Sequence, residues 1–280
     1  MKLSIPDTKF NHLIEYIIKE YDSYGPIRKD GKVVFSRLAN SSDLYLFSKK
    51  TQISFKNIVF PAIQETGYRK LEKIALIGLN NCDVWSFHRL WDQFKKTNIL
   101  VNKEDVLIIG MECKPDQNCF CDMVGANEYA PFDLFIQEAK NEIEVFSGST
   151  KGTNILKTIG LKQKDNNLVL RKIGQDKNKY DQKLISSVID KKAKNLDLWQ
   201  SISNNCFGCG ACSAVCPLCF CFRQTFENTT FGKSVHNLKW DSCFAKCFSE
   251  IQNRHDFRPT NTDRFYNWYH HKFVRSYFQN

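Results

Sequence analysis

The sequence has no stretch of 18 consecutive apolar residues, so we expect no membrane-spanning helix. Its opening residues, MKLSIPDTKFNHLIEYIIKEY, lack the charged segment and short apolar run of a secretory signal peptide. No Gly-x-Gly-x-x-Gly fingerprint follows a strand pattern, so we expect no flavin or nicotinamide cofactor on this chain. The lack of a membrane-spanning segment and of a signal peptide favours a cytoplasmic protein.

Cysteine, in contrast, is abundant, with 12 in a chain of 280 residues. This length suggests about two domains of roughly 100–200 residues each. Either disulfides in an oxidising compartment or bound metal in a reducing one explains so many cysteines. Cysteines two positions apart, such as Cys219 and Cys221, are poor partners for a mutual disulfide. We therefore interpret them as metal-bound thiolates of a cytosolic protein.

The formal net charge of +10 is spread over Lys- and Asn-rich segments such as KQKDNN, which are typical of a solvated surface. One segment near the C-terminus, RFYNWYHHKFVRSYF, combines basic and aromatic residues as nucleic-acid-binding surfaces do. A zinc-dependent nucleic-acid-binding protein is therefore the alternative of a different class.

Apolar patterns predict an α/β fold for the first part of the chain. Residues spaced as one face of a helix open it: Phe10, Leu13, Ile14, Ile17 and Ile18. A strand pattern follows in GKVVFSRL, and from residue 73 strand and helix patterns alternate. Apolar strands at 74–79 and 106–111 flank an amphipathic helix at 83–95, and shorter strands follow at 133–136 and 143–147. Such alternation predicts a partly parallel sheet.

We expect two domains, joined in the polar segment 171–182. The first is an α/β domain over residues 1–170. The second, over residues 171–280, is a small, loop- and helix-rich, ferredoxin-like dicluster domain that ends in a docking tail.

The second domain opens its cysteine motif with the bacterial ferredoxin run Cys-x2-Cys-x2-Cys-x3-Cys-Pro, formed by Cys206, Cys209, Cys212, Cys216 and Pro217. This spacing lets a tight loop place thiolates on several corners of a 4Fe-4S cubane. Glycines at positions 208 and 210 allow the backbone a positive φ close to the cluster. Structural zinc usually takes two Cys-x2-Cys pairs separated by a longer loop, and these cysteines are too dense for that.

Four more cysteines follow and bring the total to the eight that two cubanes need: Cys219, Cys221, Cys243 and Cys247. In two-cluster ferredoxins the fourth cysteine of the run ligates the other cluster. The first cluster would thus use Cys206, Cys209 and Cys212 with one late cysteine. The second would use Cys216, Cys219 and Cys221 with the other. The spacing does not say which of Cys243 and Cys247 joins which cluster, and one of them could be an unligated core residue.

A second group of cysteines lies in the α/β domain. Cys82 follows the strand IALIGLN, and Cys113, Cys119 and Cys121 follow the strand VLIIGME. Open α/β sheets bind ligands at the carboxyl ends of their strands. We therefore expect a third site for a 4Fe-4S cluster or for zinc, although Cys82 on its own would better fit a small buried residue.

Two further features bear on cluster chemistry. Lys233, Lys239 and Lys246 lie close in sequence to the cysteines and are candidates to raise cluster potentials, although lysines are more often simply solvated. Arg258 and Arg264 belong to a tail that we expect to pack over the cluster domain or to dock a partner.

The chain resembles the β (iron–sulfur) subunit of nickel–iron sulfhydrogenases, which are NAD(P)-linked hydrogenases, and the related A subunit of anaerobic sulfite reductase. The similar segments are YGPIRKDGK, SSDL, SFKNIVFPAIQE (with Phe60, Pro61 and Glu65), GLNNCDVWSFHRL (with Gly78, Cys82 and Asp83), ECKPDQNCFCDMVG, CFGCGACSAVCPLCFCF, WDSC (with Trp240) and FRPTNTDRFYNWYHHKF (with Arg258, Pro259, Arg264, His271, Lys272 and Phe273). Together they span most of the chain. Cys247 fits the pattern of this family least well.

This resemblance implies an electron-transfer subunit of a multisubunit hydrogenase that is not catalytic alone. Its partners would be a flavin- and NAD(P)H-binding subunit and the small and large nickel–iron subunits. The resemblance leaves the sulfite reductase complex as an alternative.

Overall fold

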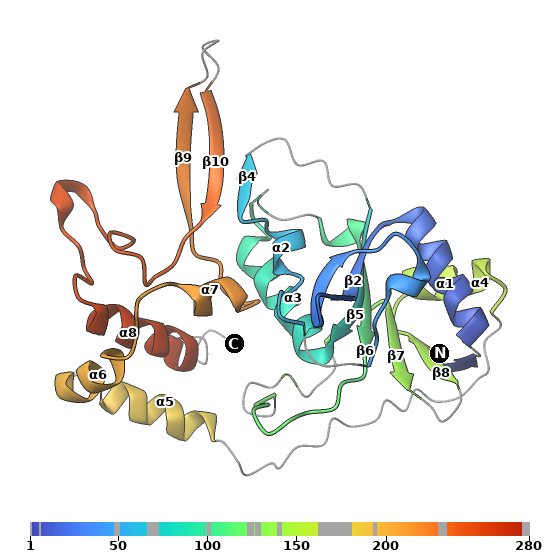
Figure 1. Ribbon diagram of the computed structural model, residues 1–280, viewed down its shortest axis with the longest axis horizontal. Coiled ribbons are helices and arrows are strands. Elements are labelled where there is room, and N and C mark those ends of the chain that lie inside the picture. The colour runs from blue at the N-terminus through green and yellow to red at the C-terminus, as the bar shows by residue number, and fades with distance from the viewer. Residues whose placement is uncertain are drawn as a thin grey trace.

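The computed structural model describes residues 2–5, 7–47, 51–65, 73–97, 99, 102–121, 126, 130–138, 142–161, 181–192, 195–228 and 234–275. Figure 1 shows two parts: a region built around a sheet, which contains the N-terminus, and a region of helices with a long hairpin, which follows it in the chain. None of the described helices is long and apolar enough to cross a membrane.

A seven-stranded sheet forms the centre of the first region, in the order β1-β8-β7-β6-β5-β2-β3. Its strands are β1 (Lys2–Ile5), β2 (Asp22–Lys29), β3 (Lys32–Arg37), β5 (Ile74–Asn80), β6 (Val106–Met111), β7 (Leu134–Glu138) and β8 (Ile143–Ser147). The four central strands β2, β5, β6 and β7 run parallel, whereas β1, β3 and β8 pair antiparallel. The predicted partly parallel sheet is confirmed.

Helices cover both faces of this sheet. The helices are α1 (Asp7–Glu20), α2 (Lys56–Val59), α3 (Asn81–Phe94) and α4 (Thr150–Thr158). Ala75 and Ile77 of β5 join the core under α1 and α4, whereas Ile74 and Leu76 join the core under α3. Because successive side chains of a strand point to opposite faces, a fully apolar strand such as β5 feeds both cores. The result is a three-layer α/β/α sandwich.

Three helices of the second region form a small cluster with the π-helical turn at His271–Arg275: α5 (Gln182–Lys191), α6 (Leu196–Ser203) and α8 (Asn261–His270). The short helix α7 (Ala211–Val215) lies between α6 and the hairpin in the chain. Trp199 of α6 packs against Tyr266 and Tyr269 of α8, with ring centroids 5.0 and 5.8 Å apart. Aromatic residues of the basic tail are therefore used in internal packing.

A hairpin in the second region was not predicted. It pairs β9 (Phe222–Asn228) with β10 (Ser234–Trp240), and β10 also pairs with β4 (Ile63–Glu65) from the first region. The Trp240 amide donates to the Ala62 carbonyl at 2.8 Å, which ties the end of β10 to the residue that precedes β4. Figure 1 shows β4 beside the base of this hairpin.

The predicted elements of the first region are present: the opening helix, the strand at Lys32–Arg37, both apolar strands, the helix between them and the two shorter strands. The second region has more sheet than expected because of its hairpin, and its ferredoxin-like arrangement stays a prediction. The boundary at residues 170 and 171 lies outside the described residues, as does the predicted seam except for its last two residues.

Candidate iron–sulfur site

The ferredoxin run forms a loop that enters and leaves α7. Cys206 follows α6, and its amide donates to the Ser203 carbonyl at 2.9 Å. Gly208 and Gly210 have φ of 67° and 73°, so both occupy the left-handed region that favours glycine. A Cβ at Gly210 would lie 2.9 Å from that of Ser242, which shows how closely this loop approaches the late cysteine segment. The backbone thus has the positive φ angles at Gly208 and Gly210 that the motif predicts.

Hydrogen bonds link three thiols, those of Cys219, Cys221 and Cys243, where the two cysteine segments meet. Cys219 shares a hydrogen bond with Cys221, which together with burial raises the pKa of Cys219. The Cys221 thiol in turn shares a hydrogen bond with Cys243, which lowers the pKa of Cys243. Both Cys219 and Cys243 are buried. The first of the late cysteines therefore lies with Cys219 and Cys221.

Cys247 lies in different surroundings. It is exposed and adopts a φ of 69°. The pKa of its thiol is raised, above all by a hydrogen bond with Glu250, and the nearby charges are those of Glu250, Lys246 and Asp256. The surroundings of Cys247 therefore differ from those of the Cys219, Cys221 and Cys243 thiols.

A cavity of about 270 Å³ lies between the two cysteine segments. Its lining includes Cys209, Cys219, Cys221, Lys56 and Trp240. The indole Nε1 of Trp240 is buried and has no hydrogen-bond partner among the described residues. A buried N–H without a partner calls for an acceptor, and cluster sulfurs accept hydrogen bonds. The cavity, its thiols and this donor therefore fit a bound iron–sulfur cluster.

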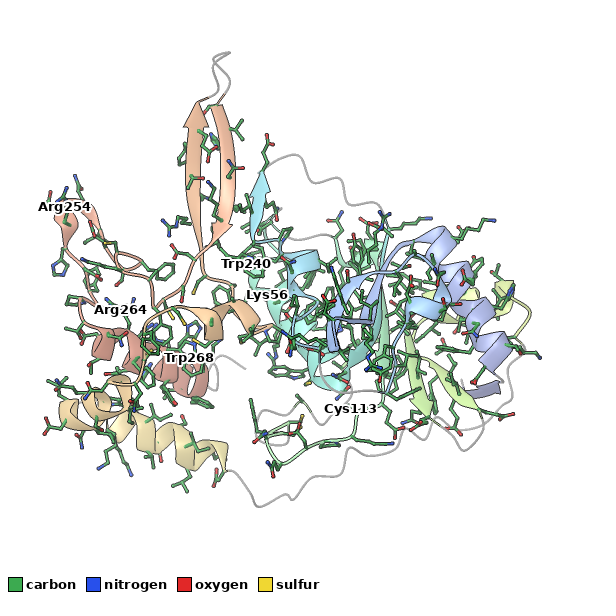
Figure 2. All side chains as sticks on the ribbon, in the orientation of Figure 1. Lys56, Cys113, Trp240, Arg254, Arg264 and Trp268 are labelled. Carbon is green, nitrogen blue, oxygen red and sulfur yellow. The ribbon has the colours of Figure 1, made fainter. Side chains whose placement is uncertain are left out.

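Two lysines point their ammonium groups toward the same cysteines. The Lys272 Nζ lies 3.4 Å from the Cys216 Sγ. Burial lowers the pKa of Lys272, but attraction to Cys216 and Cys219 outweighs burial, and its pKa is raised. Lys56 is 2% exposed, and its Nζ donates to the Ser213 carbonyl at 3.0 Å. Figure 2 labels Lys56 and Trp240 side by side at the base of the hairpin.

Within the described residues, no three or more histidine, cysteine, aspartate or glutamate side chains lie close enough together to hold a single metal ion. A cubane distributes its four thiolate ligands over four irons. Its ligands therefore stand further apart than those of one ion. The spread of the thiols around the cavity suits this larger group.

The second group of cysteines comes together at the carboxyl edge of β5 and β6. These two strands run parallel, with Asn80 opposite Met111, so Cys82 and Cys113 follow neighbouring strand ends. The pKa of Cys82 is raised well above its usual value, first by a hydrogen bond with Cys121 and then by burial, and Cys113 adds a smaller charge effect. The structure therefore brings three of the four predicted ligands near one another.

The backbone holds Cys121 in this position. The buried Asn81 side chain donates to the Ala126 carbonyl at 2.7 Å, and the Ala126 amide donates to the Cys121 carbonyl at 2.8 Å. Cys119 occupies the same loop, where its Sγ accepts from the Asp116 amide at 3.2 Å. In Figure 2 the labelled Cys113 lies at the start of this loop, away from Lys56 and Trp240. The two groups of cysteines are therefore separate sites.

Sequence reasoning missed the part that Lys56 plays in the site. This residue lies far in sequence from every cysteine of the C-terminal region, and only folding brings it to Ser213. Its one visible signal is a lysine between apolar residues in SFKNIVFP, where a charged side chain on a short buried segment needs a partner. Of the lysines expected from the sequence to lie near the cysteines, Lys246 does lie near Cys247, whereas Lys239 pairs with Glu227 at 2.8 Å and Lys233 is outside the described residues.

Comparison with known proteins agrees with this geometry. Residues 205–280 match the family model of the 4Fe-4S dicluster domain. The chain is 25% identical to the sulfhydrogenase 2 subunit beta of Pyrococcus furiosus, over 91% of this chain and 82% of that protein. No solved structure matches the chain. A dicluster domain implies two 4Fe-4S clusters, and the resemblance inferred from the motifs is confirmed: residues 205–280 match a 4Fe-4S dicluster domain, in a chain similar over most of its length to a sulfhydrogenase β subunit.

Proposed function

We propose that this chain is the iron–sulfur electron-transfer subunit of a cytosolic, multisubunit hydrogenase of the sulfhydrogenase type. It would relay single electrons between a flavin- and NAD(P)H-binding subunit and the nickel–iron subunits. The observation that supports this most is the cavity that Cys209, Cys219 and Cys221 line, together with the hydrogen bond that joins Cys221 to Cys243. When bound there, 4Fe-4S clusters supply one-electron couples whose potentials the protein sets.

The thiol contacts favour one division of the eight cysteines. Cys243 shares a hydrogen bond with Cys221, so we assign Cys216, Cys219, Cys221 and Cys243 to one cluster. The other cluster would use Cys206, Cys209 and Cys212, with Cys247 as the remaining late cysteine. The charge effect of Cys206 on the pKa of Cys212 supports their membership in one set.

We propose a third 4Fe-4S cluster on Cys82, Cys113, Cys119 and Cys121, with zinc as the other possible occupant. The support is the contact of Cys82 with Cys121 and the neighbouring Cys113 at one sheet edge. Such a cluster would extend the relay into the α/β region and toward a partner bound there.

Cys209→Ser tests the relay. We expect this variant to lose about four irons and most of its electron transfer between partner subunits, while the α/β region stays folded. Iron content, circular dichroism and electron transfer in the assembled complex are the measurements. Ser41→Ala, at a site remote from the cysteines, is the control. Full iron and full activity in Cys209→Ser would contradict the ligand assignment.

The same purified complex identifies the partners. A nickel-containing partner that reduces this chain with hydrogen supports the hydrogenase, whereas a sirohaem-containing partner would replace it with the sulfite reductase alternative.

A further inference from the structure

Lys56 is buried in a way that lysine rarely is. Its side chain is 2% exposed, and lysine is seldom fully buried without a partner of opposite charge. The contacts made by its Nζ are to neutral groups: the Ser213 carbonyl at 3.0 Å and the Trp240 ring, whose centroid is 4.0 Å away. Neither contact neutralises the ammonium charge. Burial lowers the pKa of Lys56, and attraction to Cys219, Cys216 and Cys221 opposes this effect.

Lys272 reaches the same thiols from the other end of the chain. It belongs to the π-helical turn His271–Arg275 after α8, and its Nζ lies 3.4 Å from the Cys216 Sγ. π-Helical turns are rare and often mark functional sites. Lys56 and Lys272 are also close enough to repel each other. Two positive charges held close together away from water require a negative charge nearby. The cysteines mark where that negative charge would lie.

We propose that Lys56 and Lys272 form a cationic pair that raises the reduction potential of the cluster on Cys216, Cys219, Cys221 and Cys243 above that of its companion. The inference rests on the proposed function. Reduction adds one electron, delivered by the reduced redox partner, and therefore one negative charge to this site. Fixed positive charges in a medium of low dielectric favour the more negative state. The pair thus makes this cluster the preferred electron acceptor of the two.

The test is a redox titration of the purified full-length protein under exclusion of oxygen, followed by electron paramagnetic resonance. Lys56→Met and Lys272→Met remove each charge and keep a side chain of similar length. We expect each to lower the reduction equilibrium constant of one cluster about tenfold or more, where tenfold is about 59 mV for a one-electron couple. The second cluster should keep its potential. Lys56→Arg and Lys272→Arg should restore most of the shift because they keep the charge.

Lys239→Met is the matched control. Lys239 directly precedes Trp240, but its Nζ pairs with Glu227 at 2.8 Å. Both potentials should therefore stay at their wild-type values. If the removal of any lysine near the cysteines changed the potentials, Lys239→Met would change them too. That result would overturn the specific role of Lys56 and Lys272.

Iron content distinguishes the other outcomes. Unchanged potentials in Lys56→Met and Lys272→Met at full iron content would overturn the proposal. Loss of about four irons in both would show that the lysines hold the cluster rather than tune it, which also overturns it. Cys216→Ser tests the proposed function separately: wild-type iron and spectra in that variant would mean that Cys216 does not ligate a cluster, and wild-type protein without iron would mean that no cluster is bound there.

Discussion

His271 shows how the position of one residue sets its protonation. It precedes Lys272, and its ring lies 5.8 Å from that of Phe220, between Cys219 and Cys221. Burial lowers the pKa of His271 to about 4, and the charges of Lys272, Arg275, Arg258 and His270 add to this. Its ring is therefore neutral at neutral pH and adds no positive charge to that of Lys272 beside the cysteines.

The lowered pKa predicts a pH-dependent stability. In the unfolded chain His271 titrates near pH 6.5, whereas in the folded chain it takes up a proton only near pH 4. Its stabilising effect is thus complete above pH 6.5 and is lost as the pH falls toward 4. At pH 5.5 we expect a loss of about 1 kcal/mol relative to pH 7.5. Unfolding curves measured without oxygen should show this loss in the wild type and a smaller one in His271→Gln. Equal losses in both would contradict the assignment.

At the scale of single residues, the sequence predicts the cysteine ligands better than it predicts the side chains around them. The spacing of Cys206, Cys209 and Cys212 is a local property, and the positive φ of Gly208 and Gly210 follows from it. The contact of Lys56 with Ser213 joins residues 157 positions apart. No local pattern encodes such a contact, because it depends on how the two regions pack.

At the scale of elements, periodicity predicts the core reliably. The helix expected at 83–95 is α3, and Val84, Phe87, Leu90 and Phe94 are its buried face. In contrast, β9 and β10 form a hairpin of mostly half-exposed and exposed residues, in which polar positions hide the strand pattern. Strand β4, with only three residues, is too short to be predicted from sequence.

The packing of α3 gives a prediction for this element. Leu90 is 1% exposed and lies in the core between α3 and the sheet. Leu90→Ala should lower the free energy of unfolding by about 2–5 kcal/mol, because it removes buried methyl groups and leaves a cavity. Asp92→Ala, on the exposed side of the same helix, removes an ion pair with Lys95 at 3.3 Å and should cost less than about 1 kcal/mol. Denaturant unfolding compares the two, and equal effects would mean that α3 does not pack as described.

At the scale of the whole molecule, the clusters proposed at the two cysteine sites would form a relay that crosses both regions. The C-terminal site includes a residue of the first region, Lys56, and the hairpin pairs with β4 of that region. The Cys82 site lies at the carboxyl edge of the central sheet. The two regions therefore act together: the first contributes a charge to the clusters that the second is proposed to hold.

The number of irons per chain tests the proposed relay most directly. The measurement is metal and acid-labile sulfide analysis of protein purified without oxygen, together with its visible spectrum. We predict about twelve irons with matching sulfide, a broad brown absorbance that dithionite bleaches, and about eight irons in Cys82→Ala. About eight irons in the wild type and no change in Cys82→Ala would confine the clusters to the dicluster domain. A colourless protein that contains zinc instead of iron would contradict the relay and support the nucleic-acid-binding alternative.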